Sequence, residues 1–410
     1  MINVGVLGFG TVGSGVVEVI ETNGKKIGKR IGEPLNVKYI LDYKDFKGTP
    51  VENKIVHEFK TILEDPEIQI VVEVLGGIEP AYTYVKKSLL AGKSVVTSNK
   101  ALVAAHGAEL LSIAKDNNIN FLFEASVGGG IPIIRALNTS LTADEIEEID
   151  GILNGTTNYM LTKMEEDNAE YEDVLKEAQE KGYAERNPEA DVMGYDACRK
   201  IAILSSLISG HQVDFEDIYC EGITEITKTD IDYAKKLGYK IKLVAVSKRH
   251  FGNHLHAIVA PFMVGKENPI FHVDGVMNAV VVRGNMLGDA MFYGAGAGKL
   301  PTASAVVGDI VDEAKNLHNN VMPMWKEETL ILDDYASMRR KFFVRVKGTW
   351  EAMSKDLKDY FGKDIEPVFL DGRDDEFGFI TPIIMEGDYE TRSKVFKDVI
   401  LNRIRVEFYD

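Results

Sequence analysis

Four acidic side chains and a lysine gather in the segment GYAERNPEADVMGYDACRKIAILSSL, which spans residues 182–207. The five are Glu185, Glu189, Asp191, Asp196 and Lys200. Asp196 and Lys200 are four residues apart and share one face of the helix predicted from Tyr195 onward. Because this helix is apolar over much of its surface, we expect part of the pair to be buried. Several carboxylates brought to one lysine predict a site for a zwitterionic or cationic substrate.

The charged segment is also compatible with two simpler roles. An exposed salt bridge is the ordinary reason for oppositely charged side chains four residues apart on a helix. Glu185, Glu189 and Asp191 also carry the oxygen ligands that divalent cations prefer. A surface ion pair and a divalent-metal site therefore stay open beside the interpretation as a substrate site.

A glycine motif at the start of the chain predicts dinucleotide binding. Gly8, Gly10 and Gly13 form G-x-G-x-x-G between an apolar run of strand type and a predicted helix. The first glycine permits a tight turn, the second lets the backbone approach a pyrophosphate, and the third lets the helix pack on the strand. The helix N-terminus supplies free N–H groups for phosphate. The alternative is a glycine turn that serves packing alone.

The choice between NAD and NADP depends on the end of the second predicted strand. Asp42 lies there, in VKYILDYKDFKG, with no arginine beside it. A carboxylate at this position binds the ribose hydroxyls and favours NAD, whereas a basic residue favours the additional phosphate of NADP. Lys44 and Lys47 are close enough in sequence to reach such a phosphate, so dual use stays open.

Three patterns of elements must position these residues. Strand–helix alternation over residues 1–130 predicts an α/β Rossmann domain with a parallel sheet, completed by a returning helix at 303–317. Residues 131–302 predict an α+β domain for substrate binding and dimerisation. A linker at 318–340 leads to residues 341–410, where the pattern predicts a βαββαβ domain. Its last three elements are expected to be a strand at 377–386, a helix at 391–401 and a strand at 404–409.

Composition narrows the class of protein further. The chain has 410 residues, a length typical of two to three domains, and its net charge of -17 argues against a nucleic-acid partner. No apolar run is long enough to cross a membrane, and MINVGVLGFG has the pattern of a strand rather than a signal peptide. The two cysteines, Cys198 and Cys220, build neither a disulfide framework nor a thiolate metal site, which fits the cytoplasm.

Several motifs in order resemble the homoserine dehydrogenase family over residues 1–315. GILNGTTNYMLTKM (151–164) precedes the charged segment, and the other matching segments are GFGTVG, EVLGGIEPAY, TSNKALVAAHG, EASVGGGIPIIRAL and YGAGAGKLPTASAVVGDI. The resemblance implies an NAD(P)-dependent enzyme that interconverts L-aspartate 4-semialdehyde and L-homoserine in threonine and methionine biosynthesis. A binding protein that has lost its chemistry would be expected to lack Lys200, Asp196 or Lys100, and all three are present.

The same resemblance implies roles for individual residues. Lys200 would be the acid/base, Lys100 would lie near the nicotinamide and the substrate, and Glu185 and Asp196 would hold the substrate, with Asp191 beside them from the charged loop. The residues implied to line the cofactor are Phe9, Thr11, Val12, Lys100 and Gly298, together with the three glycines and Asp42. A monovalent cation, Na⁺, would bind Glu124, Val127, Gly129 and Ile131, mostly through carbonyls. A glycine hinge is the alternative for that turn.

The C-terminal pattern resembles an ACT module, a small ligand-sensing fold. Related enzymes carry a D-R-P-G-like turn after its first strand, but this chain has KGTWEA at 347–352, which puts end-product binding in doubt. A dimerisation or purely structural module is the alternative. The resemblance also implies a homodimer in which the central domain pairs its sheet with that of a second copy.

Overall fold

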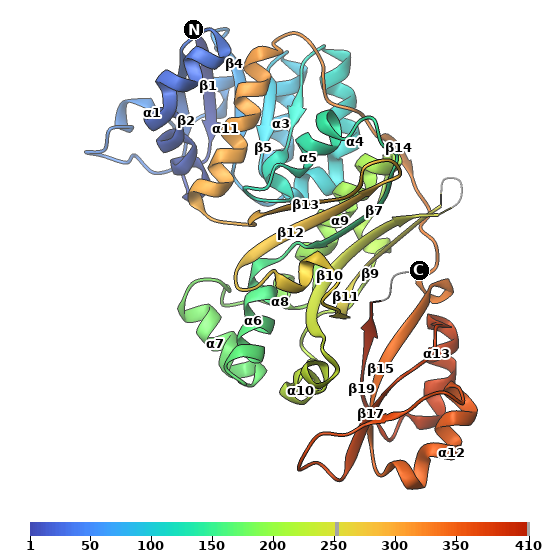
Figure 1. Cartoon of the computed structure of the whole chain (residues 1–410). Coiled ribbons are helices and arrows are strands. Elements are labelled where there is room, and N and C mark those ends of the chain that lie inside the picture. Colours follow the sequence, from blue (N-terminus) through green and yellow to red (C-terminus); the bar gives the residue numbers. More distant parts are fainter. Residues whose placement is uncertain (251–253, 408–410) are drawn as a thin grey trace.

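The first domain is built on a parallel sheet of six strands in the order β3-β2-β1-β4-β5-β6 (Figure 1). A computed structural model describes residues 1–250 and 254–407. The strands are β1 (Ile2–Leu7), β2 (Leu35–Leu41), β3 (Ile55–Val56), β4 (Ile68–Glu73), β5 (Ser94–Thr97) and β6 (Phe121–Leu122). This order is that of a Rossmann sheet, as the strand–helix alternation predicts.

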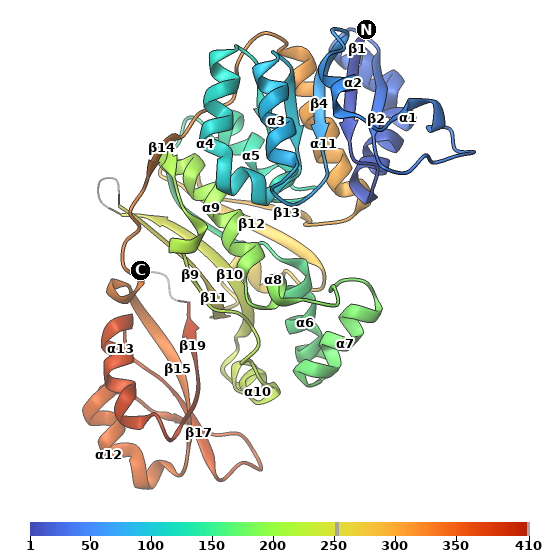
Figure 2. The same ribbon diagram turned by 180° about the vertical axis from the view of Figure 1, so that it is seen from behind.

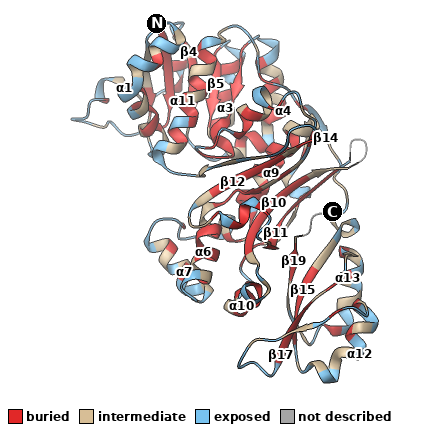
Figure 3. Ribbon diagram, in the orientation of Figure 1, coloured by how far each residue is buried: buried red, intermediate tan, exposed pale blue. Residues whose placement is uncertain are grey.

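Helices cover both faces of this sheet. Figure 1 shows α1 (Thr11–Ile31) and α11 (Lys299–Lys315) on one face, and Figure 2 shows α2 (Phe59–Leu63), α3 (Ala81–Leu90) and α4 (Lys100–Asp116) on the other. The returning helix predicted at 303–317 is α11, which begins four residues earlier than expected. It packs closely on α1, since a Cβ at Gly15 would lie 2.9 Å from the Cβ of Ala303. Because both faces are covered, β1 and most of β4 are buried (Figure 3).

The central domain contributes part of a second, mixed sheet, which has the strand order β13-β12-β7-β10-β11-β19-β15-β17-β16. Its own strands are β7 (Ile146–Ile152), β9 (Tyr219–Cys220), β10 (Lys240–Arg249), β11 (Leu255–Val264), β12 (Met277–Gly284) and β13 (Gly288–Ala295). Its helices are α5 (Ile133–Arg135), α6 (Gly155–Glu166), α7 (Tyr171–Glu180), α8 (Glu189–Val192), α9 (Tyr195–Ser209) and α10 (Lys228–Leu237). Helix α9 packs on β10, where the Ser205 hydroxyl donates to that of Ser247 at 2.8 Å.

The C-terminal elements follow the predicted order, with shifted boundaries. They are β15 (Arg339–Lys347), α12 (Trp350–Phe361), β16 (Pro367–Val368), β17 (Glu376–Ile380), β18 (Ile384–Met385), α13 (Glu386–Ser393) and β19 (Ile400–Val406). The strand expected over 377–386 stops at Ile380 because Pro382 cannot donate to a sheet. The expected helix at 391–401 begins at Glu386 instead, and residues 408 and 409 of the last strand, expected over 404–409, lie outside the described residues.

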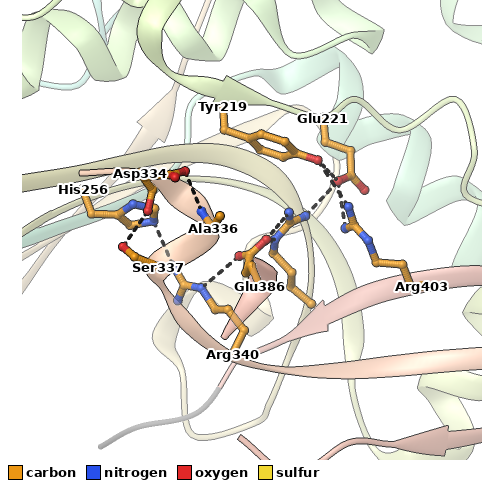
Figure 4. Close-up of polar contacts among 10 residues, drawn as sticks. Tyr219, Glu221, His256, Asp334, Ala336, Ser337, Arg340, Glu386 and Arg403 are labelled. Carbon is orange, nitrogen blue, oxygen red and sulfur yellow. Dashed lines mark hydrogen bonds and ion pairs between the residues drawn. The ribbon is translucent and has the colours of Figure 1, made fainter. Parts of the chain in front are cut away.

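The C-terminal elements are joined to the central domain by backbone pairing and by buried charge. Strand β19 pairs in parallel with β11. Arg405 on β19 is fully buried, and its guanidinium contacts Glu386 at 2.7 Å and Glu221 at 2.8 Å. Figure 4 shows Glu221 also facing Arg403, and the two side chains lie 2.9 Å apart. No pattern in the sequence predicts this buried network.

The expected linker at 318–340 is a packed segment. Its short strand β14 (Lys326–Thr329) pairs with β8 (His211–Gln212). Trp325 is buried against α4, where a Cβ at Gly107 would lie 2.3 Å from its ring, and its indole N–H donates to Gln212 at 2.8 Å. Trp325 therefore anchors this connection to the first domain, while the four residues of β14 are exposed.

Candidate active site

Asp196 lies at the centre of the charged segment, in the first turn of α9. Gly194 precedes this helix with a φ of +84°, a conformation that glycine adopts without strain. One oxygen of Asp196 lies 2.8 Å from the Nζ of Lys200, and the other lies 2.6 Å from the Nζ of Lys100. Asp196 is 4% exposed and Lys200 is 8% exposed. The Asp196–Lys200 pair is therefore buried, unlike an ordinary surface salt bridge.

A second contact fixes the ammonium group of Lys200. Its Nζ donates to the carbonyl oxygen of Leu153 at 2.7 Å, just after the end of β7. An ammonium group has three N–H donors, and Leu153 and Asp196 take two of them. No acceptor among the described residues takes the third donor.

Asn154 links two carboxylates of the charged segment and was missed by sequence reasoning. Its Nδ2 donates to Asp191 at 2.7 Å and to Asp196 at 2.9 Å. Its Oδ1 caps α6 by accepting the N–H of Thr157 at 2.9 Å. The only signal in the sequence is an asparagine at a strand–helix junction, which predicts a helix cap but not the carboxylates it meets.

The two aspartates have opposite electrostatic surroundings. Burial would raise the pKa of Asp196, but the charges of Lys200 and Lys100 outweigh it and hold that pKa well below its usual range. Burial raises the pKa of Asp191, and the charge of Asp196 adds to the increase, while the hydrogen bond from Asn154 opposes it. Asp196 is thus the permanent anion of the site.

Glu185 is not brought into contact with this cluster. It is exposed on the loop between α7 and α8, and its carboxylate makes no hydrogen bond or ion pair with the described residues. The loop itself is tied to α6, because the hydroxyl of Thr156 donates to the carbonyl of Tyr183 at 2.6 Å. Glu185 therefore lies in a segment that is anchored next to the site.

The predicted glycine turn has the geometry that a pyrophosphate requires. Gly8 has a φ of +100°, and a Cβ at Gly13 would lie only 2.0 Å from the carbonyl oxygen of Gly8. Gly10 is the N-cap of α1 and has no side chain to occupy the free N–H groups of the first turn. Thr11 and Val12 begin that turn. The residues present therefore fit a phosphate group at this helix N-terminus.

Asp42 lies directly beside this turn. Its carboxylate accepts the N–H of Phe9 at 2.9 Å and the N–H of Lys44 at 3.0 Å. The ring of Phe9 contacts Phe46 edge to face, with 4.9 Å between centroids. The hydrogen bonds aim the carboxylate at the glycine turn, and each oxygen keeps a lone pair for a ligand hydroxyl.

Lys100 is held at the N-terminus of α4 by a cap of its own. The side chain of Asn99 accepts the N–H of Leu102 and donates to the carbonyl of Gly77 at 2.6 Å. Asn99 thereby joins two motifs, EVLGG and TSNK, that are separate in the sequence. The side chain of Lys100 is 43% exposed, so it contacts Asp196 from an open edge. Gly298, the N-cap of α11, is exposed and has a φ of +120°.

The residues expected to hold a cation are grouped around buried charge. The carboxylate of Glu124 accepts the N–H groups of Ile134 and Arg135 at 2.8 and 2.6 Å. Burial raises the pKa of Glu124 and also, well above its ordinary value, that of Asp309, whose carboxylate accepts the N–H of Glu124. The N–H of Ile133 already contacts the carbonyl of Ile131 at 2.9 Å. Val127 and Gly129 lie in the turn between Glu124 and Ile131, and Gly129 has a φ of +58°.

Two further features of the described residues bear on metal binding and on membrane insertion. Within residues 1–250 and 254–407, no group of three or more His, Cys, Asp or Glu side chains is arranged to hold a metal ion. This finding gives no support to a divalent site at Glu185, Glu189 and Asp191. None of the helices described combines the length and the apolar composition needed to cross a membrane.

A Rossmann sheet, a phosphate-binding turn and a buried lysine–aspartate pair define the class of an NAD(P)-dependent oxidoreductase. Two family models match the chain, "Homoserine dehydrogenase" over residues 132–311 and "Homoserine dehydrogenase, NAD binding domain" over residues 8–124. The homoserine dehydrogenase of Bacillus subtilis is 43% identical over 323 residues, which are 78% of this chain and 74% of that protein. That of Helicobacter pylori is 42% identical over 84% of this chain and 81% of its own length.

Solved structures agree with these relatives. A homoserine dehydrogenase from Thiobacillus denitrificans superposes with a TM-score of 0.90 at 35% identity, covering 99% of this chain and 98% of its own. A hyperthermophilic archaeal homoserine dehydrogenase in complex with NADPH superposes with a TM-score of 0.65 at 32% identity, covering 76% of this chain and 97% of its own. The chain belongs to the homoserine dehydrogenase family.

Proposed function

We propose that the chain interconverts L-aspartate 4-semialdehyde and L-homoserine with NAD(P)H, and that Lys200 is the acid/base. The observation that carries this role is the buried Nζ of Lys200, which has two fixed acceptors, Leu153 and Asp196, and one free donor. The nicotinamide, when bound, supplies or accepts the hydride at the substrate carbon. The pathway that this reaction serves is the synthesis of threonine and methionine.

Lys200 acts on the oxygen of the reacting carbon. In the direction of reduction, negative charge develops on the aldehyde oxygen, and the free N–H of Lys200 donates a proton to it. In the direction of oxidation, Lys200 takes the proton from the hydroxyl of homoserine. Asp196 orients the amine throughout, because its own charge is held by two lysines. The ammonium group of Lys100 contacts the other oxygen of Asp196 and stabilises the negative charge that develops on the substrate oxygen.

The acidic side chains recognise the ammonium end of the substrate. Asp191 lies beside Asp196, held by the shared amide of Asn154. We infer that these two carboxylates and Glu185 accept charge-assisted hydrogen bonds from the α-ammonium group. Glu185 reaches the substrate from the anchored loop, where it has no competing partner among the described residues.

The first domain would hold the cofactor, with Lys100 and Gly298 near its nicotinamide end. The pyrophosphate and its flanks would be held by the glycine turn, which comprises Gly8, Phe9, Gly10, Thr11, Val12 and Gly13. Asp42 accepts the ribose hydroxyls, which favours NAD, while Lys44 follows it closely enough to pair with an additional phosphate. The related archaeal enzyme in complex with NADPH supports use of NADP as well.

Glu124, Val127, Gly129 and Ile131 would hold a monovalent cation such as Na⁺, mostly through carbonyl oxygens. The buried carboxylates of Glu124 and Asp309 support this proposal, because Arg135 pairs with Asp309 at 2.9 Å and no described residue forms an ion pair with Glu124. A bound cation would offset the remaining negative charge.

The remaining proposals concern organisation. Residues 1–130 with α11 bind the cofactor, residues 131–302 bind the substrate, and residues 341–410 form an ACT-like module whose ligand is open. Edge strand β13 and its turn expose Met286, Leu287, Met291 and Tyr293, which supports pairing with a second copy in a homodimer. Two free cysteines fit a cytoplasmic protein.

The test is oxidation of L-homoserine at alkaline pH, followed at the nicotinamide absorbance with NAD and NADP in parallel. Turnover by the wild type and its near-loss in Lys200→Ala are expected. Lys163→Ala is the matched control, because Lys163 also has an aspartate four residues away, Asp167 at 3.1 Å, but on the surface of α6. No turnover by a folded, cofactor-bound wild type would overturn the proposed function.

A further inference from the structure

We infer that Asn154 is a positioning residue whose amide fixes the spacing between the carboxylates of Asp191 and Asp196. The inference rests on the proposed function, in which these two carboxylates receive the substrate ammonium. Asn154 itself touches no reacting atom: it acts through the two aspartates.

The orientation of the Asn154 amide is set by the helix it caps. Its Oδ1 accepts the N–H of Thr157 at 2.9 Å and the hydroxyl of the same residue at 3.1 Å. Nδ2 therefore points away from the helix, and its two N–H groups meet one carboxylate each, at 2.7 and 2.9 Å. Asn154 is 5% exposed, and every donor of its amide has a partner.

Only an amide meets both requirements of this position. Two neighbouring carboxylates repel each other, and this repulsion is one cause of the raised pKa of Asp191. An amide caps the helix with its oxygen and offers one N–H to each carboxylate. An aspartate caps the helix equally well but donates nothing, and a serine donates a single hydrogen.

Two consecutive residues, Leu153 and Asn154, also position the proposed acid/base, Lys200. Leu153 carries the carbonyl that accepts from Lys200, and Asn154 follows it directly. The junction of β7 and α6 thus fixes the amine and both carboxylates relative to one another. Close packing keeps this junction rigid, since a Cβ at Gly155 would lie 2.7 Å from the carbonyl of Val276.

The test compares Asn154→Asp with the wild type in homoserine oxidation. Aspartate keeps the helix cap but places a buried negative charge against two carboxylates, so Asn154→Asp should lower thermal stability. Loss of two hydrogen bonds to charged groups should in addition lower kcat/KM for homoserine about 10- to 100-fold. The loss should lie mainly in KM. Asn154→Ser, which caps without adding charge, should show a smaller loss in the same direction.

A pH profile separates positioning from a structural effect. The charged groups that face Asp191 are Asp196, Lys100 and Lys200, and the amide of Asn154 is the neutral group that favours its ionised form. Removing that amide raises the pKa of Asp191 further, so the acidic limb of kcat/KM should move to higher pH. A defect of folding alone would lower kcat without moving this limb.

Asn268→Asp is the matched control. Asn268 is also a buried cap, accepting the N–H of Ile270 at 2.8 Å and donating to the carboxylate of Glu407, but it lies outside the site. Its replacement should leave the KM for homoserine and the pH profile unchanged. If the wild type oxidises homoserine and Asn154→Asp behaves like Asn268→Asp, the inference fails while the proposed function stands. An inactive wild type would overturn the proposed function itself.

Discussion

The Nζ of Lys100 lies 2.6 Å from an oxygen of Asp196, and this ion pair joins the first turns of two helices, α4 and α9. Helix α4 belongs to the Rossmann domain, and α9 belongs to the central domain. The pair therefore joins the domain proposed to hold the cofactor to the domain proposed to hold the substrate. Its position implies that Asp196 contributes to stability as well as to the chemistry.

Replacing Asp196 by asparagine should lower both activity and stability. Lys100 and Lys200 would then face each other without their shared counter-charge, and kcat/KM for homoserine should fall about 100-fold or more. The folded-state pKa of Asp196 is depressed, so its stabilising effect is present above about pH 4, the pKa of an unfolded aspartate, and is lost as the pH falls through the folded value.

Denaturant unfolding between pH 8 and pH 3 measures this dependence. The gap in unfolding free energy between wild type and Asp196→Asn should be constant from pH 8 to about pH 5 and should narrow below about pH 4. Asp167→Asn removes an exposed partner of Lys163 and should cost less than about 1 kcal/mol. A gap that widens toward acid would contradict the assigned charge state of Asp196.

Asp42→Ala should weaken NAD more than NADP. The carboxylate of Asp42 is held by the N–H groups of Phe9 and Lys44 and would bind the ribose hydroxyls directly. Losing these hydrogen bonds should raise the KM for NAD about 10-fold or more, while the 2′-phosphate of NADP does not depend on them. Asp45→Ala, an exposed neighbour, is the control. Equal effects on both cofactors would show that Asp42 only supports the turn.

Activity should depend on a monovalent cation, and Glu124→Gln should reduce this dependence. The substitution keeps the size of Glu124 and removes the charge that a cation would neutralise. The glutamine oxygen can accept from only one of the two N–H groups, Ile134 or Arg135, that the carboxylate now receives. Rates in sodium and potassium chloride would be compared with those in tetramethylammonium chloride at equal ionic strength. Identical rates in all three salts for the wild type would remove the cation from the proposal.

The parts of this fold that were predicted correctly have short-range signals. Alternating strands and helices predict the parallel sheet of the first domain, and three glycines predict its turn. The Asp196–Lys200 contact follows from a spacing of four residues on one helix. In each case, the residues that carry the signal are close in sequence or repeat with the period of one element.

The parts that were missed depend on contacts across the chain. Leu153 binds Lys200 through its backbone carbonyl, which leaves no trace in residue type. Trp325 packs on Gly107 and anchors the expected linker to the first domain, a contact between residues far apart in the sequence. Asp196 meets Lys100 because two domains come together, and the motif resemblance placed both lysines near the substrate without indicating that one carboxylate joins them.

Arg405→Met should strongly destabilise the junction of the C-terminal elements. Arg405 is fully buried, and removing its guanidinium leaves Glu386 without its main counter-charge and Glu221 with Arg403 alone, at a cost of about 3–5 kcal/mol. Arg392→Met removes an exposed partner of Asp388 and should cost about 1 kcal/mol or less. Thermal unfolding and limited proteolysis measure the difference. Similar costs for the two variants would mean that water already screens the pairs of Arg405.

Two glycines of the same helix should respond in opposite ways to alanine. A Cβ at Gly13 would lie 2.0 Å from the carbonyl oxygen of Gly8, so Gly13→Ala must displace the turn that receives the pyrophosphate. Gly24 lies in the interior of α1 with no atom within 4 Å of an added Cβ, and Gly24→Ala should stabilise the protein by about 0.5–1 kcal/mol.

Cofactor titration and thermal unfolding test both variants together. Gly13→Ala should lose most of its affinity for NAD and NADP alike, because the glycine turn binds the part of the cofactor that both share. Gly24→Ala should keep the wild-type affinity and unfold at a slightly higher temperature. Retained cofactor affinity in Gly13→Ala would mean that the turn can move aside, and the pyrophosphate would then have to be held elsewhere on the first domain.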